Sequence, residues 1–101
     1  MKKSEIIATV LRAVEEETGI DIKILVSQDK HREVVDARHI AINLLHEHGI
    51  YVTNIATVFN ATARNIRHAL SYFDTRITFS PPMKHDYERI RKSVRDSCET
   101  A

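Results

Sequence analysis

The side chains best suited to recognise another molecule lie between positions 62 and 68. Arg64 and Arg67 carry the forked guanidinium that matches two acceptors on guanine, and Asn65 can bond an adjacent donor and acceptor on adenine. These are the side-chain types that read base edges in the major groove of DNA. We therefore predict that Arg64 and Asn65 read bases, while Arg67 and His68 divide between bases and phosphates.

The spacing of the preceding residues predicts a helix-turn-helix over about residues 52–77. Ile55, Ala56 and Phe59 recur at helical spacing and would form the inner face of a short first helix, with Thr53 as its N-cap. Asn60 would end that helix, because Asn tolerates the left-handed backbone that a tight turn requires. Thr53 or Asn54 would bond a DNA phosphate from this helix.

A second helix, called the reading helix below, is predicted to start at Thr62. Thr62 would cap this helix and contact the DNA backbone. It would bury four residues, Ile66, Ala69, Leu70 and Phe73. The side chains left towards the exposed side would be Ala63, Arg64, Asn65, Arg67 and His68. Alternatively, the arginines are merely solvated, and Thr62 is only a cap.

Composition indicates an all-α chain of about six helices. The 101 residues suit one domain, 1–101, and include 43% hydrophobic residues, 2 Gly and 2 Pro. Neither a signal peptide nor a membrane span is expected, and the single Cys98 fits a reducing cytoplasm. The net charge is +1, with −2 in residues 1–50 (7 basic, 9 acidic) and +3 in residues 51–101 (8 basic, 5 acidic).

The remaining helices follow from periodicity and from helix-ending residues. Ser4 is predicted to cap a helix that ends at Gly19, and residues 20–26 favour a short helix. Ser27 or Asp29 would cap a long central helix that runs to His48.

A last helix is expected after the break that Pro81 and Pro82 impose. Its apolar seam of Tyr87, Ile90 and Val94 is thin, so we expect it to pack loosely. The same helix would be the natural place for a homodimer, whose two reading helices would sit about 34 Å apart on DNA.

The segment SQDKHREVVDARHIAINLL (27–45), followed by the helix-turn-helix, resembles the C-terminal DNA-binding domain of the bacterial DnaA replication initiator, in the Trp-repressor-like superfamily. Ala37, Arg38, Ala41 and Leu44 reproduce the core spacing of that family's long helix. The resemblance implies that Arg38 enters the minor groove. It also implies that a basic loop, Lys30, His31 and Arg32, holds phosphates. Alternatively, Arg38 pairs with an acid such as Asp36 or Glu33.

The chain departs from that family at the start of the reading helix. The family's Gly-Gly-Arg-Asp-His-Thr-Thr signature is replaced by residues 60–65, Asn-Ala-Thr-Ala-Arg-Asn, without the Asp-His and Thr-Thr pairs. We therefore expect a DNA preference different from the initiator's. The sequence has no Gly-rich phosphate loop and no preceding nucleotide-hydrolysing domain, so ATP-driven assembly is not expected.

Enzyme and metal readings are less favoured than DNA binding. His39, His46 and His48 do not share one face at ligand spacing, and no catalytic constellation is visible, so no catalytic residue, metal or cofactor is predicted. The predicted partner is double-stranded DNA, with replication or transcription control and a cytoplasmic, nucleoid-associated location. A replication or transcription protein is a further candidate partner, and a membrane is not. The alternative function is a helical protein-protein adaptor that does not bind DNA.

Overall fold

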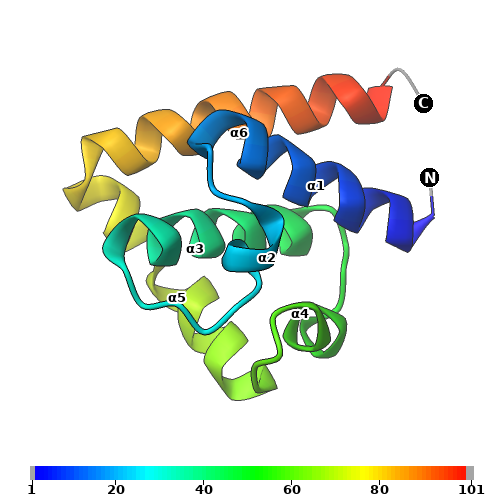
Figure 1. The fold of residues 1–101 in the computed structure, drawn as a ribbon, viewed down its shortest axis with the longest axis horizontal. Helices are drawn as coiled ribbons and strands as arrows, with labels where there is room; N and C mark the ends of the chain where they lie inside the picture. The colour runs from blue at the N-terminus through cyan, green and yellow to red at the C-terminus, as the bar shows by residue number, and fades with distance from the viewer. Residues whose placement is uncertain (1, 100–101) are drawn as a thin grey trace.

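A computed structural model describes residues 2–99, and six helices run through this range (Figure 1). Their bounds are α1 Lys3–Thr18, α2 Ile22–Leu25, α3 Arg32–Glu47, α4 Val52–Val58, α5 Ala63–Phe79 and α6 Pro81–Glu99. The all-α fold and the helix-turn-helix are confirmed, with α4 and α5 forming the latter. In Figure 1, α1 and α6 lie above α3, whereas α4 and α5 lie below it.

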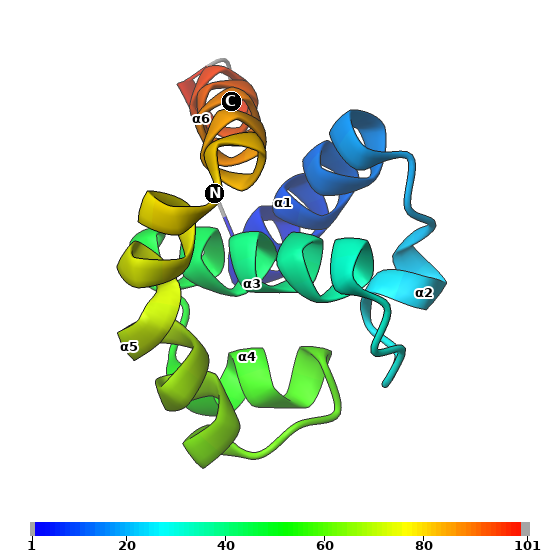
Figure 2. The same cartoon turned by 90° about the vertical axis from the view of Figure 1, so that its left-hand side faces the viewer.

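Helix α3 is the central element of the fold and packs against each of the other five helices (Figure 2). Its buried side chains are Val34, Ala37, Ile40, Ala41, Ile42, Leu44 and Leu45. Ile42 is buried together with Ala41 and Leu44 because α3 is covered on more than one side. Such a helix can hold the elements above and below it in fixed positions.

The expectation that the last helix packs loosely is wrong. Met83, Tyr87, Ile90 and Val94 of α6 are all buried, the last two completely. Tyr87 also donates a hydrogen bond to Glu47 at 2.6 Å, and Arg89 pairs with Glu17 of α1 at 2.8 Å. The apolar seam that we assigned to dimer pairing is therefore covered within the chain.

Two predicted N-caps are also wrong. Helix α1 is capped by Lys2 rather than Ser4, and α4 by Tyr51 rather than Thr53, in both cases without a side-chain hydrogen bond. Both helices begin earlier than predicted, so Ser4 and Thr53 lie within the first turn. Packing of the apolar faces, more than the capping side chain, sets where these helices start.

Candidate nucleic-acid interface

The turn between α4 and α5 has the backbone that a helix-turn-helix needs. Asn60 has a φ of 51°, which is the left-handed conformation that the sequence predicted for this position. The amide of Ala61 donates to the carbonyl of Ala56 at 2.9 Å, which closes the turn tightly over a small side chain. Phe59 and Ile55 fill the space beneath the turn and are buried. The two helices are thus held together by apolar contact.

Helix α5 starts where the sequence predicted. The Thr62 hydroxyl accepts a hydrogen bond from the backbone amide of Asn65 at 3.1 Å, so Thr62 is the N-cap. Ile66, Ala69 and Phe73 are buried, whereas Leu70 is only half-buried against the core. The inner face of α5 is therefore fixed by packing.

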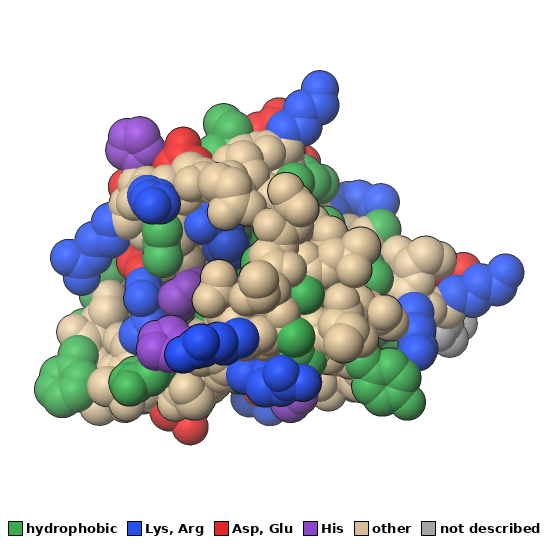
Figure 3. Space-filling model, turned by 90° about the horizontal axis from the view of Figure 1, so that it is seen from below, with side chains coloured by type: hydrophobic (Ala, Val, Ile, Leu, Met, Phe, Trp, Pro, Cys, Tyr) green, Lys and Arg blue, Asp and Glu red, His purple; other side chains and the backbone are tan. Residues whose placement is uncertain are grey.

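The opposite edge of α5 presents its polar side chains to solvent. Arg64, Asn65, Arg67 and His68 are exposed, and Ala63 is half-buried. Thr53 and Asn54 are exposed on α4. Figure 3, which views the molecule from below, shows Lys, Arg and His side chains across this face, with acidic side chains mainly near its rim. The predicted reading helix thus stands on an accessible face with few carboxylates.

Tyr72 extends this edge by a further turn of α5, and sequence reasoning missed it. Its side chain is 53% exposed, and its ring lies 4.6 Å from that of His68. The spacing could have found it, because Tyr72 lies outside the predicted buried stripe and one helical turn after the exposed His68.

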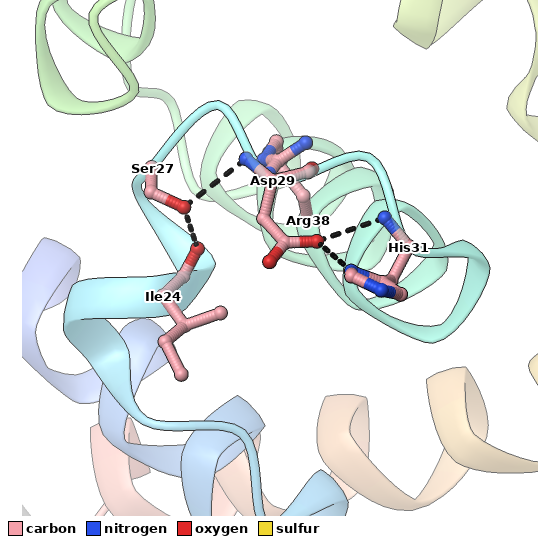
Figure 4. Close-up of polar contacts among 5 residues, drawn as sticks. All are labelled: Ile24, Ser27, Asp29, His31 and Arg38. Carbon is pink, nitrogen blue, oxygen red and sulfur yellow. Dashed lines mark hydrogen bonds and ion pairs between the residues drawn. The ribbon is translucent and has the colours of Figure 1, made fainter.

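The loop between α2 and α3, residues 26–31, is ordered by its own side chains. We predicted Ser27 or Asp29 as the N-cap of the long helix, but that cap is His31, without a side-chain hydrogen bond. Instead, Ser27 Oγ accepts from the amide of Asp29 at 3.1 Å, and Asp29 Oδ1 accepts from the amide of His31 at 2.8 Å (Figure 4). Both side chains shape the loop before the helix begins.

A histidine-carboxylate contact lies at the exposed end of this loop. His31 Nδ1 lies 2.7 Å from Asp29 Oδ1. The hydrogen bond to Asp29 raises the pKa of His31 above 6.5, helped by the charges of Asp29 and Glu33. The backbone and side-chain hydrogen bonds from His31 lower the pKa of Asp29. Lys30 and Arg32 are exposed on either side of His31, so the predicted basic loop faces solvent.

Arg38 lies beneath this loop and is half-buried. Its Nε donates to the carbonyl of Leu25 at 3.0 Å, and its NH2 group donates to the carbonyl of Asp29 at 2.9 Å. Figure 4 shows Arg38 beside Asp29. Burial lowers the pKa of its guanidinium, which nevertheless stays charged. In the structure, Arg38 therefore makes neither of the acid pairs weighed as alternatives, with Asp36 or Glu33, and entering a groove would require it to leave both carbonyls.

Gln28 connects the loop to the helix-turn-helix. Its side-chain amide donates to the carbonyl oxygens of Phe59 at 3.2 Å and Asn60 at 3.1 Å. Sequence reasoning missed this contact, because one glutamine in a polar loop carries no periodic or motif signal.

His39 of α3 lies beside Ile66 and Ala69 of the reading helix. Burial, followed by the positive charge of Arg76, lowers its pKa to about 4. Its Nδ1 atom is buried without a hydrogen-bond partner in the described structure. The described residues contain no group of three or more His, Cys, Asp or Glu that could hold a metal ion.

Comparison with protein families identifies the chain. A family model described as the bacterial dnaA protein helix-turn-helix matches residues 7–71, which is more than half of the chain. The chain belongs to this family. The match runs from α1 into α5 and includes the basic loop, Arg38 and the turn at Asn60, so membership in the DnaA helix-turn-helix family supports DNA binding.

Domains of this family are typically not enzymes. A search of curated proteins found no match to the chain. No helix in the described part of the structure has the length and apolar character needed to cross a membrane.

Proposed function

We propose that this chain binds double-stranded DNA by placing the N-terminal half of α5 in the major groove. The observation that carries the proposal is the exposed polar edge of α5, where Arg64, Asn65, Arg67 and His68 stand clear of the core behind a capped N-terminus. Arginine and asparagine there can each make two-point contacts with a base. Thr53, Asn54, Thr62 and Ala63 approach the sugar-phosphate backbone beside them.

In the proposed complex, the basic loop contacts the DNA flanking the major-groove site. Lys30, His31 and Arg32 are exposed and can neutralise phosphates, which sets orientation without reading sequence. Arg38 enters this proposal mainly as the residue that shapes the loop, because its guanidinium bonds the carbonyl of Leu25 at the end of α2 and that of Asp29 in the loop. Direct entry of Arg38 into the minor groove, as the family resemblance implies, would exchange those bonds for base contacts.

The proposed target differs from the initiator's own site. Residues 60–65 lack the Asp-His and Thr-Thr pairs of the family signature, so the base contacts must come from other side chains. Selection of bound sites from a random duplex pool identifies the target. A site resembling the initiator's box would indicate replication control at the nucleoid, and an unrelated palindrome would indicate a dimeric transcription regulator.

Direct binding to duplex DNA, followed by fluorescence anisotropy, tests the proposal. We expect binding that weakens steeply with salt, because each neutralised phosphate releases counterions and contributes about −0.9 to the slope of log K against log salt. Replacing Lys30 and Arg32 together by alanine should flatten that slope by about two units. Replacing Lys92 and Arg95 on α6 removes the same charge from the opposite side of the fold and serves as the control.

The outcome against DNA binding is equally concrete. If the wild-type chain shows no salt-dependent affinity for duplex DNA and instead forms a stable complex with a replication or transcription protein, it is an adaptor. If the loop variant and the α6 variant have equal slopes of log K against log salt, the loop does not contact the DNA.

DNA affinity should also depend on pH through His31. Its pKa lies above 6.5, so below that pKa the imidazole is protonated and adds a positive charge beside the phosphates. As the pH rises through the pKa, this charge is lost and Asp29 is left unneutralised. We expect affinity to fall roughly two- to fivefold between pH 6 and pH 8 at constant salt, an exposed-pair effect of the size usual for such charges.

The variant His31→Gln provides the reference for this measurement, because it keeps a polar side chain that does not titrate. Its affinity should change less over the same pH range. Parallel pH curves for the two proteins would show that His31 does not face the DNA.

A further inference from the structure

We infer that Gln28 is a positioning residue that locks the basic loop to the turn of the helix-turn-helix, so that both parts meet DNA as one rigid unit. This inference rests on the proposed function. Gln28 Nε2 lies 3.2 Å from the Phe59 carbonyl and 3.1 Å from the Asn60 carbonyl, although 31 and 32 positions separate them in the chain. It directly joins the two segments proposed to contact DNA.

The turn presents carbonyl groups that need a donor from outside α4. Asn60 adopts the left-handed conformation, and the amide of Ala61 reaches back to Ala56, so the chain leaves the helical ladder at this point. The carbonyls of Phe59 and Asn60 then point to the loop side, where the glutamine amide donates to both. Gln28 therefore acts as a capping group for α4 supplied by a distant segment.

The direction of the Gln28 side chain is fixed from both sides. On one side, Ser27 Oγ donates to the Ile24 carbonyl at 2.6 Å, and on the other Arg38 holds the Asp29 carbonyl at 2.9 Å. The backbone around Gln28 is thereby attached to both α2 and α3. The amide is placed before any DNA arrives, which lowers the ordering cost of binding.

Hydrogen bonding, more than apolar packing, joins the loop to the turn of the helix-turn-helix. A cavity of about 160 Å³ lies at this junction, and its lining includes Gln28, Arg38, Phe59 and Asn65. Where a cavity separates two segments, few van der Waals contacts hold them together. Gln28 is also exposed and outside the core, so its loss should free the loop without unfolding the chain.

The substitution Gln28→Met tests the inference, because it keeps the length and neutrality of the side chain but removes both donors. We expect the affinity for the selected duplex to fall roughly three- to tenfold, because the freed loop must then be ordered when DNA binds. The melting temperature should fall by only about 2–6 °C, the scale of one or two hydrogen bonds lost from an exposed side chain. Free of DNA, the amides of Asp29 and His31 should exchange with solvent faster, since their loop bonds would open more often.

A double-mutant cycle with Lys30→Ala separates positioning from mere stability. If Gln28 positions the loop, removing Lys30 should cost clearly less affinity in the Gln28→Met background than in the wild type. The same cycle with Lys92→Ala on α6 should be additive. If the wild type binds DNA, but the effects of Gln28→Met and Lys30→Ala are additive and amide exchange is unchanged, the inference about Gln28 is wrong and the proposed function stands. If the wild type does not bind duplex DNA, the proposed function itself is wrong.

Discussion

Replacing Arg64 with alanine should weaken binding to the preferred duplex by roughly five- to 150-fold, or about 1–3 kcal/mol. Arg64 is exposed in the first turn of α5, directly after the cap at Thr62, which is the part of a reading helix that reaches base edges. A guanidinium that bonds two acceptors of guanine loses both contacts at once. Anisotropy titration of the selected duplex measures the change.

The pattern across DNA sequences distinguishes base reading from charge. A set of duplexes, each with one base pair changed, should show that Arg64→Ala loses discrimination at one position and keeps it at the others. Arg95→Ala on α6 removes an identical side chain away from the interface and should leave both affinity and discrimination unchanged. An equal loss on every duplex would make Arg64 a phosphate contact.

The sequence predicted the helix-turn-helix well because local rules determine it. The turn depends on one residue with a positive φ, Asn60, and the second helix on one cap, Thr62, and both act over a few neighbouring residues. The inner faces follow from helical spacing. Leu70, at the edge of the predicted stripe, is only half-buried.

Features that depend on distant segments were beyond sequence reasoning. The α6 seam looked thin, but α1, α3 and α5 all contact this helix, and Met83 completes the seam beside Tyr87. Ser27 and Asp29 have the side chains of N-caps, yet they bond backbone amides inside the loop. Gln28 contacts the turn across 31 positions, and no local pattern encodes such a pairing.

The exposure of the candidate site residues was predicted better than their partners. Helical spacing places Arg64 and Arg67 outside because the buried positions are already taken. For Arg38, spacing gave the helix face but not the two carbonyls that it bonds, because those belong to the end of α2 and to the irregular loop that follows it. Whether an arginine side chain is solvent-exposed or hydrogen-bonded to backbone carbonyls therefore depends on the tertiary structure.

Acid should destabilise the fold through His39, by about 2 kcal/mol between pH 6.5 and pH 4 after allowance for partial exposure to solvent. Its pKa is about 4 in the folded chain and near the ordinary value of 6.5 when unfolded. Between these values the unfolded state binds more protons, so stability falls as the pH falls. The cause is burial between α3 and α5, where the Arg76 charge also opposes protonation.

Urea unfolding of the wild type and of His39→Gln at several pH values isolates this contribution. The neighbouring groups, including the Asp36–Arg76 ion pair, are the same in both proteins, so the difference between the two stabilities reports His39. As the pH falls from 6.5 to 4, the free energy of unfolding of the wild type should decrease relative to that of His39→Gln. His46→Gln, at an exposed position of the same helix, should follow the wild type throughout. A constant difference for His39→Gln would mean that His39 takes up its proton equally in both states, and the contact of α3 with the reading helix would then not depend on a neutral imidazole.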